Sequence, residues 1–390
     1  MTQPAAPVAL LNSLSEEEAA QSSKASAVRF YRPELDVLRF CAFGIVYFGH
    51  ALTVYADSPD WLKALKTIAG VGVPLFFALS AFLVTELLRT EKILTGGVDI
   101  RAFYQRRILR IWPLYFLVLG IGFLLSHLNP GTPVSVYALM GYVLLLGNWY
   151  TGRHDYLPFG LGPLWSIPIE EQFYLLWPWL VRSANRRAVA FICFAAFICS
   201  HATLLYLCYR HTLYNPTVWT NSLVQLQYFA IGVGLCALLN GSVPKLRGML
   251  RVPIILGGFL VFPAAEYLFN AAGIRGQEGY SSIPHTFPTF LAGDISVILI
   301  LVGFLGCKSL ESWRSLRYLG KISYGLYLFH PFALRIADHM ALSVGLDSLA
   351  IASVAGLLVD VGIAWLSYEY FEKPFLRSKE RYAIVKSRAV

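Results

Sequence analysis

Ten apolar runs, each long enough to cross a lipid bilayer, constrain this chain more than any other feature of its sequence. They lie near 35–55, 70–89, 108–127, 165–181, 188–208, 219–239, 252–269, 289–306, 318–336 and 348–370. A membrane helix needs about 20 predominantly apolar residues. Because lipid offers the backbone no hydrogen-bond partner, such runs fold as helices. The sequence therefore predicts an all-α integral membrane protein, a bundle of about ten transmembrane helices.

The composition agrees with lipid as the main solvent of the chain. Hydrophobic residues make up 56% and charged residues only 14%, whereas soluble domains carry roughly a quarter charged residues. The formal net charge of +9 is then explained by a membrane surface, with the lipid bilayer as partner and no nucleic acid. We expect a disordered cytoplasmic tail at 1–28, a transmembrane domain at 29–377 and a basic cytoplasmic tail at 378–390.

The distribution of Lys and Arg predicts the orientation, because basic loops stay on the cytoplasmic side. With ten spans and both termini inside, 25 of the 32 Lys and Arg residues fall in cytoplasmic segments and 5 in outer loops. An eleventh apolar run, 136–150, would invert every later loop if it crossed. We therefore predict a re-entrant or interfacial element there, between the third and fourth spans.

Arg39 and His50 both lie within the first predicted span. Their separation of eleven positions is about three helical turns, which places them on one face and about 16 Å apart along the axis. An ionisable residue at such depth is costly unless it faces a polar cavity or a partner. The alternative to a cavity role is a packing role for His50 and, for Arg39, an i,i+3 ion pair with Asp36.

A cluster of arginines, Arg106, Arg107 and Arg110, opens the third predicted span. Arg107 and Arg110 share a helix face. The cluster is explained either by the basic flank of a membrane helix or by a surface that binds phosphate groups. The spacing alone does not separate the two interpretations.

Two adjacent carboxylates, Glu170 and Glu171, follow Trp165 and Ser166 at the outer end of the fourth span. Neighbouring positions point about 100° apart on a helix, so one carboxylate is expected to face the same cavity as His50. A carboxylate beside an imidazole directs it as a general base. A pair of solvated interfacial acids is the alternative.

The ninth span places Tyr327 and His330 toward the outer side. A metal site built from His50, His330 and a glutamate is conceivable, but no ligand spacing supports it. We therefore expect no metal. We take Tyr327, His330, Ser166 and Trp165 as candidates for the acceptor side of a reaction.

Six segments, taken in order, resemble the acyltransferase-3 family of bacterial multi-pass membrane O-acyltransferases. The resemblance covers nearly the whole chain, and one departure is Ala81, where a Ser-Gly pair is usual. The segments are RPELDVLRF, FFALSAFL, FYQRRILRIWPLY, LWSIPIEEQFYLLWP, ISYGLYLFHPF and SYEYFEKPF.

The resemblance implies transfer of an acyl group, commonly acetyl from acetyl-CoA, to a hydroxyl. The acceptor would be a cell-surface polysaccharide such as exopolysaccharide or lipopolysaccharide, a lipid-linked saccharide, peptidoglycan or a small molecule. It also implies a location in the bacterial inner membrane, that His50 and Arg39 are essential, and that Arg107 and Arg110 form the family's arginine motif.

These inferences combine into one hypothesis. CoA docks from the cytoplasm on Arg39, Arg107 and Arg110, and His50, oriented by Glu170 or Glu171, activates an acceptor hydroxyl from the outer side. Direct transfer and a covalent acyl-histidine both remain open. The alternative from another class is a transporter that uses intramembrane Arg, His and Glu.

Overall fold

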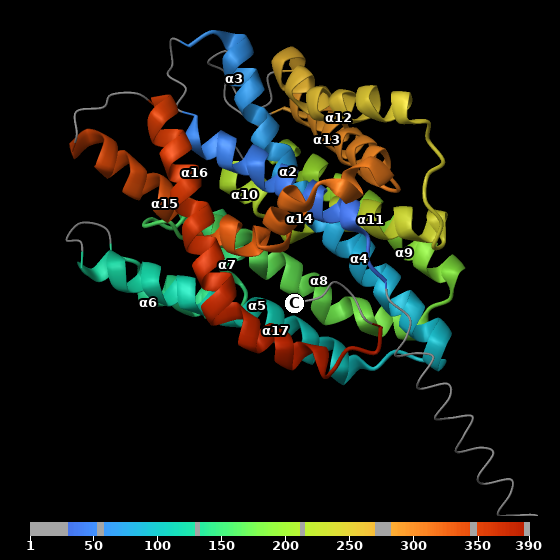
Figure 1. The fold of residues 1–390 in the computed structure, drawn as a ribbon. Coiled ribbons are helices and arrows are strands. Elements are labelled where there is room, and N and C mark those ends of the chain that lie inside the picture. Colours follow the sequence, from blue (N-terminus) through green and yellow to red (C-terminus); the bar gives the residue numbers. More distant parts are fainter. Residues whose placement is uncertain are drawn as a thin grey trace, which may run out of the picture.

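A computed structural model describes residues 30–52, 58–128, 133–210, 215–269, 282–343 and 349–385. Within these ranges the chain is helical and no strand occurs. The predicted tail at 1–28 lies outside the described residues. Figure 1 shows long helices that run side by side as one bundle.

Every predicted apolar run has a long helix as its counterpart. These helices are α2 (Pro33–Ala51), α4 (Gly72–Thr95), α5 (Ile100–Leu128), α8 (Ser166–Ser183), α9 (Arg186–Tyr209), α11 (Ser222–Leu239), α12 (Gly248–Phe269), α13 (Ile283–Phe304), α15 (Ser323–Ser343) and α16 (Leu349–Leu366). Seven helical segments of the described chain are long and apolar enough to cross a membrane. Helices α2, α8 and α15 are not among them, so a count of ten spans stays a prediction.

Short elements connect and cover the long helices. They are α3 (Asp60–Lys66), η1 (Thr67–Val71), α6 (Val136–Val143), α7 (Gly147–His154), η2 (Gly162–Trp165), α10 (Asn215–Trp219), η3 (Lys308–Ser312), α14 (Arg314–Lys321), the π-helical turn η4 (Ser367–Glu372) and α17 (Lys373–Glu380). Helices α12 and α13 pack together, as do α15 and α16, and α17 lies along α5 (Figure 1).

The run at 136–150 forms two short helices, α6 and α7, with a break between them. Each has eight residues and is therefore about 12 Å long, far less than a hydrocarbon core of about 30 Å. Asn148 of α7 donates to the Thr220 carbonyl at 3.0 Å, and Gln172 of α8 donates to Asn148 at 3.0 Å. These bonds hold the segment beside the starts of α8 and α11. Its re-entrant character remains a prediction.

Close helix contacts occur where glycine faces a neighbouring backbone. A Cβ on Gly232 of α11 would lie 2.2 Å from the Ala78 carbonyl oxygen and 2.9 Å from the Ala81 methyl of α4. The methyl group of Ala81, the position that departs from the family pattern, is therefore accommodated by a glycine on the facing helix. Likewise, a Cβ on Gly320 of α14 would lie 1.7 Å from the Asp36 carbonyl oxygen of α2.

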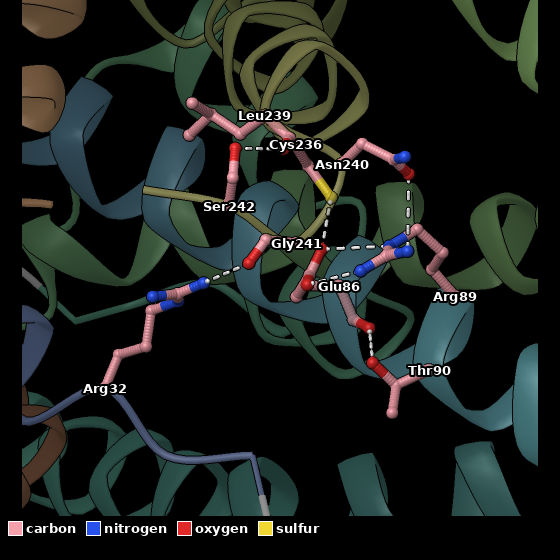
Figure 2. A network of polar contacts seen from close by, with 9 residues as sticks. All are labelled: Arg32, Glu86, Arg89, Thr90, Cys236, Leu239, Asn240, Gly241 and Ser242. Atoms are coloured by element: carbon pink, nitrogen blue, oxygen red, sulfur yellow. Dashed lines mark hydrogen bonds and ion pairs between the residues drawn. The ribbon is translucent and has the colours of Figure 1, made fainter. Parts of the chain in front are cut away.

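A polar network ties α4 to the turn after α11 (Figure 2). Glu86 accepts from Arg89 at 2.7 and 3.1 Å and from the Cys236 thiol at 3.1 Å. Arg89 also donates to Asn240 at 3.3 Å, and Arg32, just before α2, reaches the Gly241 carbonyl at 3.4 Å. The network thus fixes the start of α2 at this end of the bundle.

Candidate functional site

A cavity of about 190 Å³ lies between α2, α4, α5, α8, α15 and the C-terminal residues. At one end it is bordered by Arg32, by the arginines of α5 and by Lys379. At the other end it reaches Ser166 and Tyr327. The elements that line it are far apart in the sequence, and the bundle brings them together.

Arg39 lines the cavity and is paired with Asp36. Its Nη1 lies 2.8 Å from Asp36 Oδ1, so the i,i+3 ion pair expected from the sequence is confirmed. Asp36 Oδ2 also accepts from the Tyr31 hydroxyl at 2.9 Å. Burial and the nearby Asp36 carboxylate raise the pKa of Tyr31, which keeps the hydroxyl a donor. The pairing orients the Arg39 guanidinium at the cavity wall.

The three arginines of α5 all line the cavity but have different surroundings. Arg106 donates to Glu91 Oε2 at 3.0 Å and to the Tyr382 carbonyl at 2.6 Å. The Arg107 guanidinium lies over the rings of Phe103 and Tyr174, 5.5 and 5.1 Å from their centroids.

Within the described residues, Arg107 Nε has no hydrogen-bond partner. Arg107 is half-buried, and a guanidinium that lies over aromatic rings with an unused Nε donor is suited to binding an anionic group.

The two glutamates point in different directions, as their adjacent positions predict. Glu170 lines the cavity and accepts a hydrogen bond from the Tyr174 hydroxyl. Glu171 Oε2 accepts from Trp112 Nε1 at 2.9 Å. Glu170 is therefore the carboxylate that faces the cavity.

Neither glutamate orients His50, which differs from the expectation. His50 Nδ1 bonds the Val46 carbonyl at 2.9 Å, one turn back on its own helix. The orienting acceptor is thus a backbone carbonyl, and of the two carboxylates only Glu170 lines the cavity.

The end of the cavity away from the arginines is formed by the hydroxyl groups of Ser166 and Tyr327. Tyr327 donates to the Pro163 carbonyl at 3.0 Å and lies 2.9 Å from Ser166 Oγ. Ser166 Oγ also donates to the Pro163 carbonyl, at 3.1 Å, so both hydroxyls converge on that oxygen. Trp165 packs edge-on against Phe77 and is not among the cavity-lining residues.

His330 and His50 form a pair beyond Tyr327. Their ring centroids are 5.0 Å apart, and the Tyr327 ring lies 5.8 Å from that of His330. His330 is fully buried, whereas His50 is exposed at the end of α2. The pair brings together residues from the first and ninth predicted spans, and Tyr327 contacts both the cavity and the pair.

A proline explains how His330 is held. Pro331 lacks an N–H, so the Tyr327 carbonyl four residues earlier loses its helical donor. His330 Nδ1 lies 2.8 Å from that oxygen and replaces the missing donor. Donation from Nδ1 leaves Nε2 unprotonated, and within the described chain His330 Nε2 has no partner. His50, which donates from Nδ1 to Val46, has the same tautomer.

Several residues in or beside the cavity were not predicted from the sequence. Tyr174 lies one turn after Glu170, a spacing that could have identified it. Glu91 and Tyr382 contact Arg106 across 15 and 276 positions. No local pattern marks such contacts.

These features describe a multi-pass helical protein with a basic cavity and a buried histidine pair, and comparison with known sequences places it. Residues 32–369 match the acyltransferase domain of the acyltransferase-3 family. The chain belongs to that family, as its motifs predicted.

Two curated relatives illustrate the similarity. The chain is 27% identical over 380 residues to the putative peptidoglycan O-acetyltransferase YrhL of Bacillus subtilis, covering 88% of this chain and 55% of the relative. It is 27% identical over 360 residues to the O-acetyltransferase OatA of Staphylococcus aureus, covering 88% and 57%. The chain spans about half the length of these relatives. No solved structure matches.

Proposed function

We propose that this chain is a membrane O-acyltransferase that moves an acyl group, acetyl in the first instance, from acyl-CoA to a hydroxyl of a cell-surface glycan. Its family membership supports the acyl transfer. Peptidoglycan is the first acceptor to test, because the name of one relative specifies it.

The observation that carries the proposal is the continuity of the cavity. It joins the basic end, lined by Arg39, Arg107 and Arg110, to the hydroxyl pair of Ser166 and Tyr327. CoA is an anionic nucleotide with a long pantetheine arm that ends in the thioester. Guanidinium groups bind phosphates through forked hydrogen bonds, and the thioester would then lie at the end that adjoins the histidines.

The histidine pair supplies the base. His50 Nε2 takes the proton of the acceptor hydroxyl, whose oxygen attacks the thioester carbonyl carbon. The carbon–sulfur bond breaks, an ester forms, and the proton passes to the CoA thiolate. His330 is fully buried, and its Nε2 offers a second proton acceptor beside His50.

Glu170 and Glu171 act on the donor side in this mechanism. Glu170 fixes Tyr174, whose ring lies under the Arg107 guanidinium. Glu171 binds Trp112 and so holds α8 against α5. Both carboxylates therefore position the arginine surface that receives the donor.

Replacement of His50 tests the mechanism. We expect His50→Ala and His50→Gln to lower acetyl transfer by about 10²- to 10⁴-fold, the usual contribution of a general base. Gln keeps the polarity but cannot accept and return a proton. His127→Gln, at an exposed position near the end of α5, is the matched control and should transfer normally.

The assay measures free CoA released from acetyl-CoA when peptidoglycan fragments are added, together with the yield of folded protein. A His50→Gln variant with near-normal turnover would show that His50 only packs, and His330→Gln would then be tested as the base. A transporter would release no CoA in any variant.

A further inference from the structure

The C-terminal residues form one wall of the basic end of the cavity. After α17, three turns fold the chain back: Arg381 N donates to the Ser378 carbonyl at 3.2 Å, Tyr382 N to Lys379 at 3.1 Å and Ala383 N to Glu380 at 3.1 Å. Lys379, Ala383 and Val385 line the cavity. We call residues 379–385 the strap.

Arg106 holds the strap in place. One end of its guanidinium donates to the strap at the Tyr382 carbonyl, 2.6 Å away, and the other end to Glu91 at 3.0 Å. Glu91 is itself fixed, because its second oxygen accepts from Asp99 N at 2.7 Å. Since both ends of Arg106 are engaged by the protein, it connects α4, α5 and the strap. Arg107 and Arg110 of α5 also line this end of the cavity.

The wall that faces the same end of the cavity is aromatic and basic. Phe30, Tyr31 and Arg32 line it, and the Arg32 guanidinium lies 5.3 Å from the centroid of the Phe30 ring. Arg32 is anchored on Gly241 (Figure 2). Aromatic rings stack with a nucleobase, and basic groups bind phosphates. The combination fits the nucleotide end of a donor and not its pantetheine arm.

We propose that the strap is part of the donor site and binds the adenosine 3′,5′-diphosphate end of acyl-CoA through Lys379, with Arg106 holding the strap closed. This inference rests on the proposed function, because it takes acyl-CoA as the donor. It adds a specificity element that selects donors with a nucleotide over donors without one.

Two donors separate the role of the strap from a general effect on activity. Acetyl-CoA carries the nucleotide, and S-acetyl-pantetheine lacks it but has the same thioester. We expect Lys379→Ala to raise the KM for acetyl-CoA about tenfold, the effect of losing one charge-assisted contact, and to leave the kinetics with S-acetyl-pantetheine unchanged. Arg377→Ala, which removes an exposed cation of α17 outside the strap, should change neither.

Binding of adenosine 3′,5′-bisphosphate to the full-length protein, measured by calorimetry, needs no turnover. We expect binding to wild type and about tenfold weaker binding to Lys379→Ala. Equal losses with both donors, or wild type that does not bind the bisphosphate, would overturn the role of the strap. Bisphosphate binding without any acetyl transfer would instead overturn the proposed acyl transfer and leave the nucleotide site standing.

Discussion

At the scale of single residues, a basic side chain hydrogen-bonds the last carbonyls of a neighbouring helix. Lys92 of α4 donates to three carbonyls at the end of α8, those of Val181, Arg182 and Ala184, at 2.9 to 3.1 Å. The last carbonyls of a helix have no partner within it and carry partial negative charge. Some basic residues that the positive-inside rule counts are thus structural, and each arginine of the cavity needs its own test.

Arg107 is the arginine whose surroundings most favour a bound anion. We expect Arg107→Ala to raise the KM for acetyl-CoA by roughly 10- to 100-fold, because a hydrogen bond to a charged group contributes about 1.5 to 3 kcal/mol. Arg107→Lys should recover only part of this, because an ammonium cannot make the forked contact. Initial rates against acetyl-CoA concentration measure both effects.

Arg101→Ala provides the comparison for Arg107. Arg101 is exposed on the same helix and is not among the cavity-lining residues, so its loss should leave the KM unchanged. If Arg107→Ala behaved like Arg101→Ala while both variants folded, the cluster on α5 would serve orientation in the membrane only.

At the scale of elements, α15 lacks one backbone hydrogen bond at Pro331, and the carbonyl left without that donor orients His330. Proline inside a helix costs about 3 kcal/mol, yet Pro331 is needed to free the carbonyl that His330 binds. The helix is therefore weakened at the point where His330 faces α2. Such a local cost is typical of functional positions.

Replacing Pro331 tests this relation. Pro331→Ala restores the N–H that bonds the Tyr327 carbonyl, so the imidazole of His330 loses its acceptor and its fixed direction. We expect the free energy of unfolding to stay the same or rise. Acetyl transfer should fall about 100-fold, as small misplacements near a reacting centre can cost that much. Thermal unfolding and rates at saturating acetyl-CoA are the measurements.

Pro263→Ala in α12 is the control for Pro331→Ala, because it repairs a helix that does not line the cavity. It should have normal rates. Normal rates for Pro331→Ala as well would show that the orientation of His330 does not matter for the reaction.

At the scale of the whole molecule, hydropathy predicted the long helices but not all of their limits. Helix α5 begins at Ile100, eight residues before the apolar run. Its first turn is capped by Asp99, which accepts from Ala102 N at 2.9 Å, and its second turn carries Arg106, which is paired with Glu91 of α4. Residues 378–385 were expected as part of a tail, yet they border the cavity, and Arg106 donates to the Tyr382 carbonyl. The contacts of Arg106 join positions that are distant in the sequence, and hydropathy does not predict them.

The sequence identified several residues of the site but not the contacts between them. The spacing of Arg39 and His50 placed both on one helix face, and the structure pairs Arg39 with Asp36 as the i,i+3 spacing indicated. A glutamate was expected to orient His50, whereas the structure gives its Nδ1 the Val46 carbonyl as acceptor, a contact within one helix turn that the expectation of a carboxylate partner did not include. The close approach of His330 to His50 depends on how α15 packs against α2.

Cysteine labelling tests the orientation of the whole bundle, and the structure shows which positions a reagent can reach. Gly152 of α7 is unsuitable, because that position is buried and a Cβ there would lie 3.1 Å from Thr220 Oγ1. His154 and Ser183 are both exposed. His154 ends α7, before the start of α8, and Ser183 ends α8. The predicted orientation places α8 across the membrane, so the two positions lie on opposite sides of the membrane.

We expect His154→Cys to react with a membrane-impermeant maleimide added to intact cells, and Ser183→Cys to react only after permeabilisation. The native cysteines are first replaced by serine or alanine. The expectation follows from the positive-inside rule, since Ser183 lies beside Arg182, Arg186 and Arg187, and from the length of α6 and α7, which are too short to cross. Labelling of Ser183→Cys in intact cells, with His154→Cys protected, would place the basic end outside and reverse the side from which acyl-CoA enters.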